Sequence, residues 1–397
     1  MKVSTHKTTF QLATAALALV GVTAQADPLQ VSTASGVKAT LYGFVQLDGS
    51  WENQRGTPAP GNFTYYSQTG STAHSGEWNW TADNSRFGVN LAGPDGEGLA
   101  LGGKFEFDFY GGGSSENNPV PRLRHAYGTV AFPSVGLSFL AGQTWDLVAP
   151  LNVPTLNAGV LYQAGNLGST RRPQFRVTET VALPGNGKWE VAAAVARTIG
   201  NATNAYATNA TADAGHDADI PTFQGRTAVS LPLWVEKQFA TLGFSGHYAK
   251  EDVLQSDNSY KSVASWSGAV ELELPLVSFV SLAGEGFYGE DLATYNGGIG
   301  QGVVNGAPVE GFGGWAALRF KAGPVTANVG AGIDTVHAST VLAKTGRTSN
   351  SAVFGNVGYN LNAASKVAIE VERFETDYKA GATEDLWRTQ VAYSYNF

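Results

Sequence analysis

The chain has 397 residues, 49 of them glycine, no cysteine and a formal net charge of −8. The absence of cysteine excludes disulfide frameworks and thiolate metal sites, and the acidic balance argues against nonspecific nucleic-acid binding. Only 15% of the residues are charged, against about 25% in soluble domains, yet the mean hydropathy is −0.11. A β-barrel with a polar interior has this profile, although a soluble all-β protein can share it.

The N-terminus has the pattern of a secretory signal peptide. Lys2 and Lys7 precede an apolar run at 12–24, and Ala24-Gln25-Ala26 forms a small-x-small cleavage site. The run is too short to span a membrane as a helix. We therefore expect residues 1–26 to be removed, 27–36 to form a short periplasmic segment, and 37–397 to form the folded domain.

From Val37 onward the chain alternates between apolar and polar residues. In the segment 103–111, Phe105, Phe107 and Phe109 alternate with Lys104, Glu106 and Asp108. Successive side chains of a strand point to opposite faces, so this period of two predicts strands with one apolar and one polar face. The fold class expected is all-β.

The connections between these segments alternate in length. Short turns lie near Pro94, Pro133, Pro184, Pro232, Pro275, Pro324 and Ala363, and longer polar segments lie around 50–80, 111–121, 144–171, 199–222, 250–260, 289–310, 335–350 and 375–386. Seven turns and eight loops predict sixteen strands in a transmembrane antiparallel barrel. Counts of fourteen or eighteen remain open, because predicted boundaries err by a few residues.

The last strand is strongly apolar on one face. Trp387, Val391, Tyr393, Tyr395 and Phe397 share that face, and the chain ends on an aromatic residue. A jelly roll or sandwich also contains alternating strands, but it gives no reason for such an end. We expect the last strand to pair with the first and to close the barrel, leaving no open edge in lipid.

Five stretches resemble the DcaP-like family of trimeric outer-membrane porins. They are SRFGVNL (85–91), GKFEFDFYGGGSSENNP (103–119), PRLRHAYGTV (121–130), LAGQTWDLVAPLNVPTLNAGVLYQAGNLGSTRRPQFRV (140–177) and the closing VAYSYNF. The resemblance implies a sixteen-stranded porin of the bacterial outer membrane, surrounded by lipid and lipopolysaccharide. It also implies a homotrimer that passes small anions, dicarboxylates included, without a cofactor. Residues 27–36 leave no room for the coiled-coil extension that family members can carry. By resemblance to outer-membrane proteins, Phe397 would be the signal read by the assembly machinery.

The third loop and the polar strand faces supply the candidate pore residues. The loop 144–171 is nearly uncharged and oddly apolar for a surface loop, so we expect it to fold inward; a packed surface loop or a trimer contact is the alternative. The predicted electropositive wall consists of Arg86, Lys104, Arg122, Arg124, Arg171, Arg172 and Arg176, with Arg86, Arg122, Arg124 and Arg172 ranked highest. Rings of such cations favour anions. Glu106, Asp108 and Asp146 are expected to oppose them across the pore. Alternatively, the arginines pair with carboxylates and only brace the wall.

Other functions remain open at this stage. Glu271, Glu273, Glu285, Glu370 and Glu372 share the polar faces of later strands and favour a cation-preferring or general pore. A barrel enzyme would need a Ser or Asp nucleophile beside a histidine, and an exported sugar-binding β-protein would use the Trp and Tyr rings. The acidic loop 213–219 matches no EF-hand spacing, so a solvated loop tip is expected there and no metal site.

Overall fold

The fold is seen in a computed structural model of the chain. The structure describes residues 29–397 except 34, 57–62, 71–74, 95, 97, 112–117, 157–160, 169, 201–217, 219, 255–258 and 338–341. The predicted signal peptide and the acidic residues of the 213–219 loop lie outside the described residues. Within the described residues, no helix is long and apolar enough to cross a membrane.

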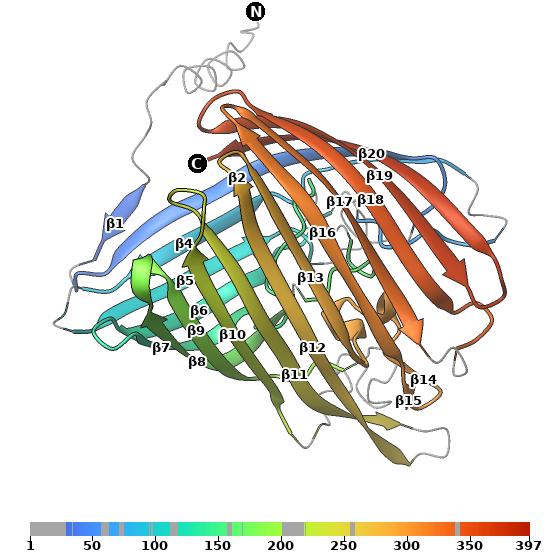
Figure 1. The fold of residues 1–397 in the computed structure, drawn as a ribbon, viewed down its shortest axis with the longest axis horizontal. Helices are drawn as coiled ribbons and strands as arrows, with labels where there is room; N and C mark the ends of the chain where they lie inside the picture. The colour runs from blue at the N-terminus through green and yellow to red at the C-terminus, as the bar shows by residue number, and fades with distance from the viewer. Residues whose placement is uncertain are drawn as a thin grey trace, which may run out of the picture.

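The described residues form a closed antiparallel barrel of sixteen strands, in which β3 and β4 together make one interrupted strand (Figure 1). The barrel strands are β2(Lys38–Glu52), β3(Glu77–Thr81), β4(Arg86–Ala92), β5(Ala100–Asp108), β6(Arg122–Phe132), β7(Leu137–Trp145), β8(Arg171–Ala182), β9(Lys188–Ala196), β10(Thr222–Pro232), β11(Phe239–Leu254), β12(Tyr260–Val277), β13(Val280–Glu290), β16(Glu310–Ala322), β17(Val325–His337), β18(Arg347–Asn360), β19(Ser365–Tyr378) and β20(Thr383–Asn396). The short elements are β1(Gln30–Ser32), β14(Val303–Val304), β15(Ala307–Pro308), η1(Pro184–Asn186), η4(Ala293–Tyr295) and η5(Gly298–Gly300). The predicted fold class and strand count are confirmed.

The long and short connections alternate as predicted, with two differences. The connections after β11 and β19 span only 255–259 and 379–382, because these strands extend further than the sequence pattern indicated. The remaining long loops begin where the polar segments were expected. One end of the barrel therefore carries short turns and the other carries most of the loop residues.

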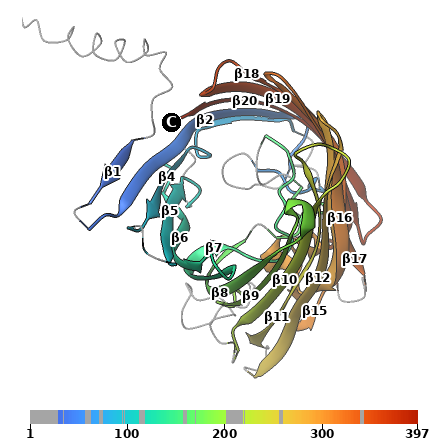
Figure 2. The ribbon, with the colours of Figure 1, turned by 60° about the vertical axis from the view of Figure 1, so that its left-hand side comes forward.

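The barrel closes between its first and last strands. β20 pairs with β19 on one side and with β2 on the other, from Phe44↔Asn396 to Glu52↔Arg388. The backbone groups of Gly43 and Phe397 then exchange hydrogen bonds of 3.1 and 3.0 Å. β1 continues along the same edge of β2, beside the C-terminus (Figure 2). The predicted closure by the last strand is confirmed. Part of the segment 27–36, which was expected to be a short periplasmic segment, forms the strand β1.

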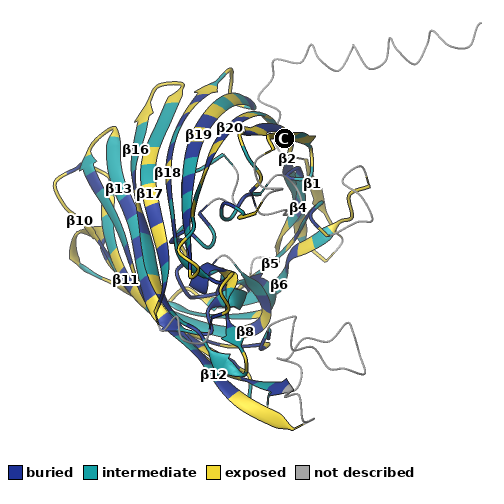
Figure 3. Cartoon of the chain, turned by 90° about the vertical axis from the view of Figure 1, so that its right-hand side faces the viewer, coloured by how far each residue is buried: buried dark blue, intermediate teal, exposed yellow. Residues whose placement is uncertain are grey.

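Exposure alternates along the strands. On β2, Val45 is 51% exposed on the outer face, whereas Asp48 is fully buried inside. Buried and exposed residues alternate along the strands of the barrel (Figure 3). The alternation fails on β6, where a register shift opposite Glu106 and Phe107 places Arg124 and His125 both among the buried residues. Such a bulge adds one residue to a strand and re-aims the side chains beyond it.

Candidate solute pathway

The described parts of the third loop, residues 146–156, 161–168 and 170, run along the inner wall of the barrel. Its backbone is held by one polar side chain from each of several strands: Gln224 on β10, Ser245 on β11, Glu285 on β13, Asn356 on β18 and Glu370 on β19. The Leu151 N–H, for example, donates to Glu285 Oε1 at 2.8 Å. In Figure 2 the green segment that follows β7 lies inside the ring of strands. The predicted inward folding is confirmed.

Apolar packing explains the unusual composition of this loop. Val153, Leu161 and Ala164 pack in one cluster with Trp315 and Phe354 from the wall. Burying such side chains is favourable by about 25 cal/mol per Å² of apolar surface. The apolar residues of the loop therefore belong to a core inside the barrel.

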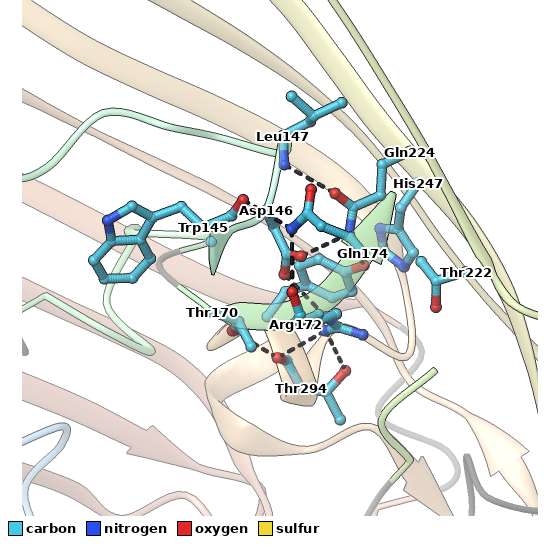
Figure 4. Close-up of polar contacts among 12 residues, drawn as sticks. Trp145, Asp146, Leu147, Thr170, Arg172, Gln174, Thr222, Gln224, His247 and Thr294 are labelled. Carbon is cyan, nitrogen blue, oxygen red and sulfur yellow. Dashed lines mark hydrogen bonds and ion pairs between the residues drawn. The ribbon is translucent and has the colours of Figure 1, made fainter. Parts of the chain in front are cut away.

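The base of the loop is a buried polar network (Figure 4). Arg172 Nε donates to Asp146 Oδ2 at 2.9 Å, and Gln224 Nε2 donates to Asp146 Oδ1 at 2.8 Å. Burial raises the pKa of Asp146, and the charge of Arg172 opposes this. The Arg172 guanidinium also lies 4.1 Å from the ring centroid of Tyr295, and burial raises the pKa of that tyrosine. Arg172 and Asp146 therefore brace the loop base, and the expectation that they face one another across the pore is wrong.

The basic side chains of β4, β5 and β6 share one wall with two carboxylates. Arg122 donates to both oxygens of Asp108 at 3.0 and 2.7 Å. Arg124 donates to Glu106 at 2.6 Å and to Asp108 at 2.7 Å. Asp108 and Arg122 are direct cross-strand partners, so their side chains meet on the same face. The expected placement of Glu106 and Asp108 across the pore is wrong for this reason.

Cations exceed carboxylates on this wall. Arg86 and Lys104 lie 3.7 and 3.8 Å from Glu106, which Arg124 already contacts. Arg171, at the start of β8, adds a fifth cation whose charge interacts with those of Arg122 and Arg124. Among the described residues of β4, β5, β6 and β8, the five cations Arg86, Lys104, Arg122, Arg124 and Arg171 share this wall with the two carboxylates Glu106 and Asp108, so these seven groups have three positive charges in excess. Arg176 lies further along β8, where it donates to Gln174 Oε1 at 3.0 and 2.8 Å.

The glutamates of the later strands are engaged elsewhere. Glu285 and Glu370 accept hydrogen bonds from the third loop, which covers them. Glu271 pairs with Arg226, Glu273 pairs with Arg319 at 2.8 Å, and Glu372 lies 3.5 Å from Arg388. Each of these glutamates is thus covered by the third loop or lies beside an arginine, and Arg226 and Arg388 are shared with Glu190 and Glu52.

The first loop also enters the barrel, which the sequence analysis missed. The Ser67 N–H donates to Thr376 Oγ1 at 3.0 Å, and Asn350 Nδ2 donates to the Tyr65 carbonyl at 2.7 Å. Arg347 lies over the ring of Tyr66 at 4.1 Å. The aromatic residues of this otherwise polar loop were the one local signal of its burial.

Two histidines on barrel strands form hydrogen bonds with buried hydroxyl groups of neighbouring strands. His125 Nδ1 lies 3.0 Å from Thr144 Oγ1, and His247 lies 2.6 Å from Ser267 Oγ and 3.0 Å from Ser265 Oγ. All of these residues are buried. These contacts hold neighbouring strands together.

The comparisons place this barrel among solved porin structures. The chain is similar to the outer membrane channel DcaP of Acinetobacter baumannii, with a TM-score of 0.73, 16% identity, and coverage of 92% of this chain and 99% of that one. It is also similar to an anion-selective porin from Comamonas acidovorans (TM-score 0.58, 11% identity, 91% and 100% covered). A third similar structure is Salmonella typhi OmpF in complex with daunomycin (TM-score 0.58, 10% identity, 93% and 100% covered).

No protein-family model matches the chain, and no curated protein matches it. The chain has the fold of outer-membrane porins. The resemblance to the DcaP-like family is thus confirmed for the fold.

Proposed function

We propose that this protein is a porin of the bacterial outer membrane that passes small hydrophilic solutes by passive diffusion and prefers anions, dicarboxylates among them. It works without a catalytic step or a cofactor. It assembles as a homotrimer amid lipid and lipopolysaccharide, after removal of a signal peptide at residues 1–26.

The observation that carries the proposal is the charge imbalance on the wall formed by β4, β5, β6 and β8. Three positive charges remain there after Glu106 and Asp108 are counted, whereas Glu285 and Glu370 lie beneath the third loop. A channel with low-dielectric walls focuses such a field and raises the local concentration of the opposite charge. Guanidinium forks also match the geometry of carboxylates. The likeness to a barrel described as an anion-selective porin agrees with this preference.

The test is the reversal potential of the purified protein in a planar bilayer across a KCl gradient. We expect the wild type to prefer chloride. The double variant Arg122→Ala/Arg124→Ala removes two cations and leaves Glu106 and Asp108 without their closest partners, so its preference shifts towards potassium. Arg373→Ala is the matched control, because Arg373 shares the outer face of β19 with the exposed Val371. A cation-selective wild type would overturn the proposal.

A further inference from the structure

Arg171 differs from the other cations of the wall in the state of its N–H groups. Arg122 and Arg124 donate to Asp108 and Glu106, and Arg176 donates to Gln174. Arg171 is partly exposed, and among the described residues no carboxylate or hydrogen-bond acceptor lies against its guanidinium; its close contact is with the ring of Trp145. Its donors are therefore available to a solute.

Trp145 holds this guanidinium by its flat face. Trp145 ends β7 and is the cross-strand partner of Arg171, the first residue of β8. The Arg171 Cζ lies 4.3 Å from the centroid of the Trp145 ring, and the Arg124 Cζ lies 5.4 Å from it. Stacking against a ring uses the face of the guanidinium and leaves the N–H groups at its edge free. The indole thus orients the Arg171 guanidinium without forming hydrogen bonds to its N–H groups.

The surroundings of Arg171 favour an anion. Its charge is repelled by those of Arg122 and Arg124, and Asp108, the carboxylate that interacts with it, already accepts hydrogen bonds from both of these arginines. A negative group bound at Arg171 would relieve this repulsion. The side chain of Arg122 is 37% exposed, so a second negative group on the same solute also has a cation within electrostatic reach.

We propose that Arg171 is the residue that binds the carboxylate of the passing solute as a two-pronged donor, and that Trp145 is its positioning residue. This inference rests on the proposed anion preference and deepens it. It separates two properties of the pore. The whole wall sets the preference for negative charge, whereas Arg171 sets how long a carboxylate stays.

The first experiment substitutes Arg171→Lys and records single-channel KCl currents with succinate as the probe. Lysine keeps the charge but lacks the planar fork. We expect the interruptions caused by succinate to become about tenfold shorter, as the loss of a paired charge-assisted hydrogen bond requires. The reversal potential should stay near that of the wild type. Arg176→Lys is the matched control, because the donors of Arg176 already bond Gln174 Oε1 and the backbone carbonyl of Trp145.

The second experiment compares Trp145→Phe with Trp145→Ala. Phenylalanine keeps a ring face for Arg171, so we expect Trp145→Phe to retain most of the succinate residence time and Trp145→Ala to lose it. Resistance of the unheated barrel to SDS shows that each variant is folded.

Unchanged interruptions in Arg171→Lys, or their absence in the wild type, would overturn the inference. An anion-selective wild type with these results would leave the proposed function standing. A cation-selective wild type would remove both.

Discussion

At the residue scale, ion pairs within one wall determine how much of its positive charge is balanced by carboxylates. Asp108 accepts hydrogen bonds from both Arg122 and Arg124 at 2.7 Å. Removing one charge from such a cluster changes the net charge of the wall. Removing a charge from an ion pair on the outer surface of the barrel leaves the net charge inside the barrel unchanged. Under the proposed function, the carboxylates of this wall therefore limit the anion preference that the arginines would create.

Asp108→Asn tests this balance. The substitution removes one negative charge and keeps an oxygen that accepts hydrogen bonds, so the excess of positive charge on the wall rises. We expect the reversal potential in a KCl gradient to move further towards that of chloride. Glu375→Gln is the control, since Glu375 pairs with Arg373 on the outer face of β19. A shift towards potassium in Asp108→Asn would contradict the assignment of the wall.

At the element scale, the backbone of the third loop lies very close to the strands of the barrel wall. Gly165 has a φ of +107°, and a Cβ at this position would lie 2.2 Å from the carbonyl oxygen of Gly314. No side chain fits there, and a residue other than glycine is strained at such a φ. The glycine thus allows the loop to lie flat against β16 and β17.

Gly165→Ala should therefore loosen the loop. We expect a loss of about 1–3 kcal/mol of stability and a smaller single-channel conductance, because the added Cβ pushes the loop off the wall and towards the lumen. The temperature at which the SDS-resistant band disappears and the conductance in KCl measure the two effects. Gly268→Ala provides the comparison, since its Cβ would meet nothing within 4 Å. Equal behaviour of the two variants would refute the close-packing argument.

At the scale of the whole molecule, the C-terminal residue secures the seam of the barrel. The ring of Phe397 lies 5.4 Å from that of Phe87 on β4 and crosses β2 at Gly43, where a Cβ would lie 2.7 Å from the phenylalanine ring. Phe87 in turn stacks on Phe107 at 5.7 Å. The last side chain thus joins three strands across the closure, in addition to the assembly role that its resemblance to outer-membrane proteins implies.

Phe397→Ala separates these two roles when the protein is refolded in detergent, away from any assembly machinery. We expect the free energy of unfolding to fall by about 1 kcal/mol, the usual worth of an aromatic pair beyond its area. Heat-induced loss of the SDS-resistant band gives the measurement. Phe279→Ala, in an exposed turn between β12 and β13, should leave the barrel unchanged. If both variants match the wild type, Phe397 acts only during assembly.

The sequence by itself determined the strands, their inner and outer faces and the order of turns and loops, because a period of two is a local property of the chain. The inward folding of the third loop was also predictable from the sequence, because the exposure of its apolar residues to water would be unfavourable. The bulge at Arg124 and His125 was not, because both residues are polar and the shift depends on the neighbouring strand.

Only the tertiary structure decided which charged side chains form ion pairs and which have no charged partner beside them. Asp108 meets Arg122 because two strands pair in one register, and Ser67 meets Thr376 across 309 positions of sequence. Parity places a side chain inside the barrel but says nothing about which partner reaches it. Loop burial and ion pairing depend on such distant contacts. Among the described residues, they leave Arg171 without a hydrogen-bond acceptor, whereas Glu285 and Glu370 are covered by the third loop.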